Sequence, residues 1–233
     1  PRRYLLAPAA LIVGTALVVA AVPTARMAWV LGPYFAWQFF HYQKQNLGMA
    51  ALAAVSHRAP SLGQLERRCL VGAGVAGIVG LLTHPELLGL TGVPITARWL
   101  FPVAGLAFAA AVIVGAVALL RRPTERRPLP LVVIYGLSLL FFAPVFVFES
   151  PVRASASFAV AHGYQYLLIV GLVATGGPGS RGPQVLRRVG PLAVMIVIAL
   201  AGGWLLDRGS QQAGSVLGRA VFGAYLGAVM SHF

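Results

Sequence analysis

The chain carries little charge, and acidic residues are scarce. Of its 233 residues only 10% are charged, and just five are aspartate or glutamate. Soluble domains usually carry about 25% charged residues, so this composition excludes an ordinary soluble domain, and it also excludes a charged disordered tail. A single cysteine, Cys69, excludes an internal disulfide, a disulfide-rich secreted module and a cysteine-rich metal cluster.

Hydrophobic residues make up 58% of the chain and fall into long apolar blocks separated by short charged loops. Blocks of about 18–25 residues are typical of membrane-spanning helices. Strands of a membrane barrel are shorter and alternate in polarity, which these blocks do not do. The sequence therefore predicts an all-α, polytopic integral membrane helical bundle with about eight spans. The predicted spans are 4–22, 27–55, 68–84, 97–120, 129–148, 153–175, 189–206 and 214–233.

The positive charge is distributed unevenly between alternate loops. The chain has 18 lysines and arginines and a formal net charge of +13. Twelve arginines fall in loops on one side of the predicted bundle and four on the other. Cytoplasmic loops are enriched in arginine and lysine, so the N-terminus is predicted to be cytoplasmic, in the plasma membrane of a bacterium-like cell. Charge placed this way indicates topology and lipid headgroup contacts, and no nucleic-acid partner is expected.

The chain reads as one transmembrane domain over residues 1–233. It begins without methionine and ends inside an apolar block, which indicates a segment of a longer polypeptide. The second and sixth predicted spans both carry a histidine followed by glutamine and tyrosine. This similarity hints at a 4+4 helix repeat, although the flanking spans do not align.

Polar residues inside the predicted spans are the informative ones, because burying them in lipid is costly. The densest group is the segment 41–46 in the second span, where Gln38, His41 and Gln45 share one helical face. A second group surrounds His162 in the sixth span, at a similar depth in the membrane. His232 is predicted near the cytoplasmic boundary. The three histidines are therefore expected to converge in a polar cavity in the cytoplasmic half of the bundle.

Three interpretations of this cavity remain open. Imidazole nitrogen is a good ligand for Fe, Cu and Zn, and two histidines on different helices can also bind haem axially. The same residues can line a substrate or proton pathway, or simply make hydrogen bonds between helices. For the metal interpretation the candidate ligands are His41, His162 and His232. The expected catalytic residues are Lys44, Gln45 and Tyr166, and the expected cofactor or substrate contacts are Asn46 and Gln165.

The leading functional hypothesis is a membrane-embedded, histidine-ligated, metal-dependent oxidoreductase acting on a lipid-soluble substrate. The alternatives are a multi-pass transporter or proton-coupled carrier, and a haem-carrying or structural subunit of a membrane complex or homo-oligomer. Five scattered histidines are too few for the histidine boxes of the membrane di-iron hydroxylases and desaturases. Serine-hydrolase, zinc-protease, dinucleotide and Walker motifs are absent from the sequence.

The remaining charged residues are expected to play structural roles. Glu66 is expected to pair with a neighbouring arginine among Arg58, Arg67 and Arg68. Arg219 is expected to snorkel or to pair with Glu149 or Asp207. Lys44 either faces a wet cavity or snorkels to the cytoplasm, while His57 and His84 are expected at the membrane interface.

Small residues recur every four positions in several predicted spans, which predicts close helix packing. These stripes are Gly72-Ala76-Gly80, Gly105-Ala109, Gly214-Gly218 and Gly223-Gly227.

Overall fold

The computed structural model describes residues 3–88, 97–150, 157–158, 160–163, 165 and 214–230. Every regular element within these ranges is helical, which confirms the predicted all-α class for the described part of the chain. The α-helices are α1 (Arg3–Ala21), α2 (Met27–Ser56), α3 (Gln64–Thr83), α4 (Leu100–Leu120), α5 (Leu129–Leu139), α6 (Ala143–Val147) and α9 (Val216–Met230). Three 3₁₀ turns occur between them, at Thr24–Arg26, Pro85–Leu88 and Thr124–Arg126.

The chain divides into two compact units. One contains Pro1–Leu31 and Tyr164–Phe233, and the other contains Gly32–Gly163. The predicted spans 153–175 and 189–206 lie mostly or wholly outside the described residues.

In the first unit, α1 and α9 pack closely in antiparallel orientation. A Cβ atom added at Gly223 would lie 2.5 Å from the carbonyl oxygen of Thr15, and one at Gly227 would lie 2.6 Å from the Cα of Ile12. Only glycine permits this approach, so the predicted role of the Gly223-Gly227 stripe is confirmed. An added Cβ at Gly214, which precedes α9, meets nothing within 4 Å in the described part, so the Gly214-Gly218 stripe stays a prediction.

Arg219 fastens the same helix pair. Its Nε and Nη2 atoms donate to the carbonyl oxygen of Ala20 at 3.3 and 3.2 Å, and Nη1 donates to Gly214 at 3.3 Å. Ala20 lies in the last turn of α1, where the carbonyl groups have no helical partner. A cation at this end also interacts favourably with the helix dipole. The contacts of Arg219 in the described residues are therefore carbonyl groups.

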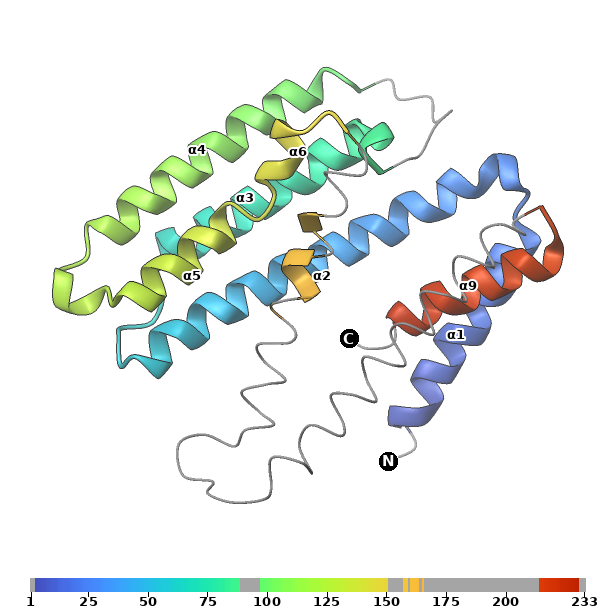
Figure 1. The fold of residues 1–233 in the computed structure, drawn as a ribbon, viewed down its shortest axis with the longest axis horizontal. Coiled ribbons are helices and arrows are strands. Elements are labelled where there is room, and N and C mark those ends of the chain that lie inside the picture. The colour runs from blue at the N-terminus through green and yellow to red at the C-terminus, as the bar shows by residue number, and fades with distance from the viewer. Residues whose placement is uncertain are drawn as a thin grey trace. The chain divides into compact units, whose positions relative to one another are not determined.

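In the second unit, α2, α3, α4 and the α5–α6 segment follow one another in alternating directions (Figure 1). Three contacts fix this order. Gln43 of α2 reaches Leu70 of α3, and Glu66 at the start of α3 contacts Arg122 just after α4. Tyr135 of α5 donates to the backbone oxygen of Glu66 at 3.0 Å. Short loops between long apolar helices produce this up-and-down arrangement.

Two glycines on α3 accommodate aromatic side chains from α6 and from the turn just before it. A Cβ at Gly77 would lie 2.3 Å from Phe142, and one at Gly80 would lie 2.9 Å from Phe146. At Gly72, by contrast, the nearest atom would be an ordinary 3.8 Å away. In the predicted stripe, Gly80 therefore packs closely and Gly72 does not. Gly77 packs closely although it lies outside the stripe.

The prediction of one continuous helix over 129–148 is wrong, because α5 ends at Leu139 and α6 begins only at Ala143. Pro144 explains the break. Its ring has no N–H to donate, and it would clash with the carbonyl of Leu140 in a continuous helix. Phe141 and Phe142 occupy the break and are 6% and 1% exposed, so the irregular backbone turns into the core rather than away from it.

Within the described ranges, α4 alone is long and apolar enough to cross a membrane as one helix, with a mean hydropathy of 2.6. A second candidate arises if Leu6–Ala21 and Thr24–Ser56 are one span broken by a bend. Eight spans therefore stay a prediction.

The glycine at position 77 offers a direct test of this packing. Gly77→Ala is expected to lower the free energy of unfolding by about 1–3 kcal/mol, because the new methyl group must displace the Phe142 ring. Gly136→Ala is the matched control, because a Cβ there meets nothing within 4 Å in the described part. It should be neutral or stabilise α5 by up to about 1 kcal/mol. Unfolding in detergent followed by circular dichroism measures both; equal losses would contradict the packing.

Candidate functional site

The polar segment of α2 divides its side chains between the core and the exterior. Tyr42, Gln43 and Asn46 are 8%, 4% and 0% exposed. Lys44 lies on the exposed side, with its Nζ atom 5.5 Å from the centroid of the Phe40 ring. This position fits a lysine that snorkels along the helix rather than one that lines a cavity.

His41 and His162 lie side by side, although 120 residues separate them in the sequence. Their ring centroids are 5.7 Å apart, with the ring planes at 79°. The Tyr42 ring lies against His162, with centroids 4.1 Å apart and planes tilted by 31°. Both histidines are half-buried. The structure thus brings together two of the three histidines singled out from the sequence.

An aromatic cluster holds His162 in this place. Phe158 precedes His162 by one helical turn and is 2% exposed. Its ring packs against those of Phe39, Phe141 and Phe142, with centroids 5.6–5.9 Å away. The Phe158 ring therefore anchors the short helical segment, and the imidazole one turn later faces α2.

Gln38, one helical turn earlier on α2, positions Tyr42. The Gln38 Nε2 atom donates to the Tyr42 hydroxyl at 2.9 Å, one helical turn away. The other amide atom, Oε1, is buried and accepts no hydrogen bond from the described residues. Gln45 Nε2, near His41 on the same face, likewise has no hydrogen-bond partner in the described part. Buried polar groups are normally satisfied, so these two atoms mark polar positions that the described side chains leave without a hydrogen bond.

Gln43 is a residue that the sequence reasoning missed. Its Nε2 atom donates to the Leu70 carbonyl at 2.6 Å, and the side chain lies flat against Gly74. Here glutamine binds two helices together rather than serving a ligand. A glycine on α3 facing a polar residue of α2 was the available signal, but spacing within each helix does not show which faces meet.

The other predicted site residues have different outcomes. Asn46 is fully buried, and its backbone oxygen accepts from Ser138 at 3.4 Å. Gln165 is helical but belongs to the other unit of the chain. Tyr166 and His232 lie outside the described residues.

Among the described residues no three histidine, cysteine or acidic side chains gather as a metal site. The His41–His162 pair can be compared with metal geometry all the same. With metal–nitrogen bonds of about 2.0–2.1 Å, two imidazoles on one ion have centroids about 4.5–6.5 Å apart, depending on the angle between the bonds. The observed 5.7 Å falls inside this range. The pair is therefore spaced as two ligands of one ion can be.

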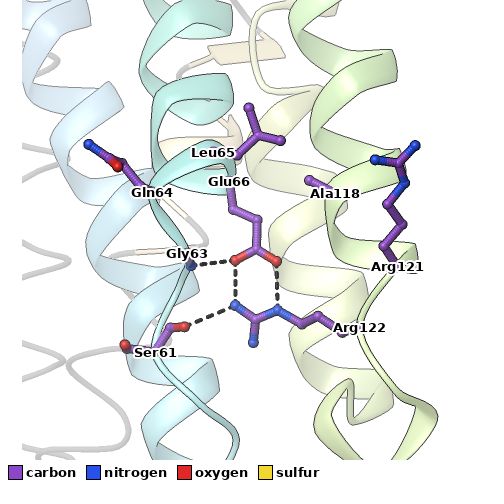
Figure 2. A pocket seen from close by; sticks show the side chains of 8 residues that line it. All are labelled: Ser61, Gly63, Gln64, Leu65, Glu66, Ala118, Arg121 and Arg122. Carbon is purple, nitrogen blue, oxygen red and sulfur yellow. Dashed lines mark hydrogen bonds and ion pairs between the residues drawn. The ribbon is translucent and has the colours of Figure 1, made fainter.

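A second polar cluster lies at the start of α3. Glu66, 4% exposed, accepts a hydrogen bond from Arg122 Nε at 2.6 Å and a second from Arg122 Nη2, so that the guanidinium grips the carboxylate with two donors (Figure 2). The backbone N–H of Gly63 donates to the same carboxylate at 2.6 Å. Glu66 thus accepts a hydrogen bond from the backbone N–H group at the start of α3, and through Arg122 it joins this helix start to the end of α4.

The prediction that Glu66 pairs with an arginine close in sequence is wrong. Its ion partner, Arg122, is 56 residues away and also donates to the carbonyl oxygens of Pro60 and Ser61, both at 2.9 Å. Arg67 instead donates to the Leu62 carbonyl at 3.0 Å. The antiparallel packing of α3 on α4 brings the two distant residues together.

An exposed ion pair lies at the opposite end of α3 and α4. Glu86 pairs with Arg98, and the two side chains are 38% and 67% exposed. His84 is the C-terminal cap of α3, and its Nδ1 atom lies 3.2 Å from the Glu86 carboxylate. Its place at the membrane interface stays a prediction.

Comparison with known protein families, with curated proteins and with solved structures gave no match.

Proposed function

We propose that the protein is a multi-pass integral protein of a bacterial plasma membrane in which His41 and His162 bind a transition-metal ion. We further propose that the metal centre performs an oxidation or reduction on a lipid-soluble substrate. The observation that carries the proposal is the 5.7 Å approach of two imidazoles from distant segments, beside a buried tyrosine.

The surface of α4 supports placement in a membrane. Only 22% of its apolar span is buried, and large side chains project outward all along it. Val103, Leu106 and Ile113 are 50%, 74% and 63% exposed. A helix that is apolar all round is normally either covered by protein or surrounded by lipid. With so little of α4 covered, lipid is the surrounding that stabilises it.

The charged ends of the α3–α4 pair support an orientation with the start of α3 and the end of α4 on the cytoplasmic side. Arg67, Arg68, Arg121 and Arg122 lie at one end, whereas the other end carries Arg98 paired with Glu86. An excess of arginine at one end is what the positive-inside rule requires of the cytoplasmic side.

The surroundings of the histidine pair favour a metal centre over a transport pathway. A carrier that uses Lys44 needs this ammonium inside the protein, whereas Lys44 lies on the exposed face of α2. The buried oxygen of Gln38 and the buried nitrogen of Gln45 provide sites for a polar substrate group or metal-bound water. Imidazole ligands suit iron and copper, the metals that supply redox chemistry.

Membrane placement is tested by washing cell membranes with alkaline carbonate and urea. The expected result is that the protein remains in the pellet and is released only by detergent. Release into the supernatant would refute the membrane proposal on its own.

The metal centre is tested by elemental analysis and optical spectroscopy of protein purified in detergent without added metal. We expect iron or copper in stoichiometric amount, with an absorption or paramagnetic resonance signal that changes on reduction. A Soret band would identify haem. Stoichiometric zinc would keep the site and refute the redox activity, and metal-free protein would refute both.

A further inference from the structure

A pocket of about 300 Å³ opens beside the Glu66–Arg122 ion pair (Figure 2). It lies between the start of α3 and the end of α4. Its walls are formed by Ser61, Gly63, Gln64, Leu65, Glu66, Ala118, Arg121 and Arg122.

The pocket has an unbalanced positive charge. Both oxygens of the Glu66 carboxylate bond to Arg122, so these two opposite charges cancel. Arg121 also lines the pocket and is exposed, and no second acidic residue lines it. An anion that enters therefore meets one guanidinium that no acidic residue of the lining neutralises; Gln64 and Ser61 lie on the other side of the ion pair (Figure 2).

The neighbouring surface is apolar. Leu65 is 50% exposed within the pocket wall, and Ala118 forms part of the same wall. Val117 and Leu120 on the adjoining turn of α4 are 41% and 57% exposed. A basic pocket that continues into an apolar helix surface matches a molecule with an anionic head and hydrocarbon chains.

We propose that this pocket binds the phosphate headgroup of an anionic phospholipid, with the acyl chains lying along α4. The inference rests on the proposed membrane placement and is independent of the metal site. It assigns Arg121 to phosphate binding, while Arg122 holds the two helices together through Glu66.

The test is native mass spectrometry of the purified protein mixed with equimolar phosphatidylglycerol and phosphatidylcholine of identical acyl chains. Wild-type protein is expected to retain phosphatidylglycerol in preference, and Arg121→Gln is expected to reduce this preference about fivefold. The matched control is Arg126→Gln, which removes an exposed arginine in the same loop but outside the pocket lining. It should leave the preference unchanged. Thermal unfolding of each variant checks that the fold is retained.

Three results would overturn the inference. The first is a wild-type protein with no preference for the anionic lipid. The second is an equal reduction by both substitutions, which would indicate general surface charge, and the third is loss of the preference in millimolar inorganic phosphate, which would assign the pocket to a free phosphate. A protein that stays in membranes and yet gives any of these results refutes the lipid site alone, whereas extraction by carbonate refutes the membrane placement first.

Discussion

Replacing Glu66 by alanine is expected to lower the free energy of unfolding by about 3–5 kcal/mol. The Glu66 side chain is 5% exposed, and the Arg122 side chain that binds it is 13% exposed. Removing the carboxylate leaves a buried guanidinium without its counter-charge and the Gly63 amide without its acceptor. The loss is measured by unfolding in mixed detergent micelles, followed by circular dichroism.

Two further variants separate the buried pair from a general effect of charge. Glu86→Ala breaks the exposed Glu86–Arg98 pair at the other end of the same helices, and it should cost no more than about 1 kcal/mol. The double variant Glu66→Leu with Arg122→Met removes both buried charges, and it should recover most of the lost stability. Equal losses in Glu66→Ala and Glu86→Ala would show that the Glu66–Arg122 pair does not join α3 to α4.

Replacing His41 or His162 by alanine is expected to abolish metal binding. Each change removes one of two neighbouring imidazoles, and a transition-metal ion held by few protein ligands does not survive the loss of one of them. The metal-to-protein ratio should therefore fall from near one to near zero in both variants. Elemental analysis of protein purified in parallel measures it.

His84→Ala serves as the control, because His84 lies beside Glu86 at a helix end and not beside the pair. It should retain the metal of the wild-type protein. The variant Gln38→Leu extends the test to the surroundings of the pair, since it removes the hydrogen bond to Tyr42 but neither imidazole. It should retain metal but shift the optical spectrum. Full metal content in His162→Ala would contradict the proposed site.

Sequence reasoning located the elements better than it located their partners. Apolar length and the residues at helix ends predicted α1, α2, α3 and α4 to within a few residues. The break between α5 and α6 was missed, although Pro144 was visible, because a proline in a long apolar block can also be carried within one helix. Which outcome occurs depends on whether the core accepts the irregular turn, as it does around Phe142.

At the candidate sites, too, the sequence predicted which residues share a helix face better than it predicted which residues meet across helices. The spacing of Gln38, His41 and Gln45 on α2 follows from helical geometry, and the approach of His162 was expected from depth in the membrane alone. The Glu66–Arg122 pair and the contact of Gln43 with α3 were not foreseen. Both depend on which faces of antiparallel helices meet, and this is set by small residues such as Gly74 on the opposite helix.

X-ray absorption at the metal edge of the purified wild-type protein shows whether His41 and His162 bind the same metal ion, because imidazole rings give a recognisable outer-shell scattering pattern. We expect one ion per chain with at least two imidazole ligands, and loss of this pattern in His41→Ala. A bound ion with no imidazole scattering, or a pattern unchanged in that variant, would show that the two histidines do not share an ion.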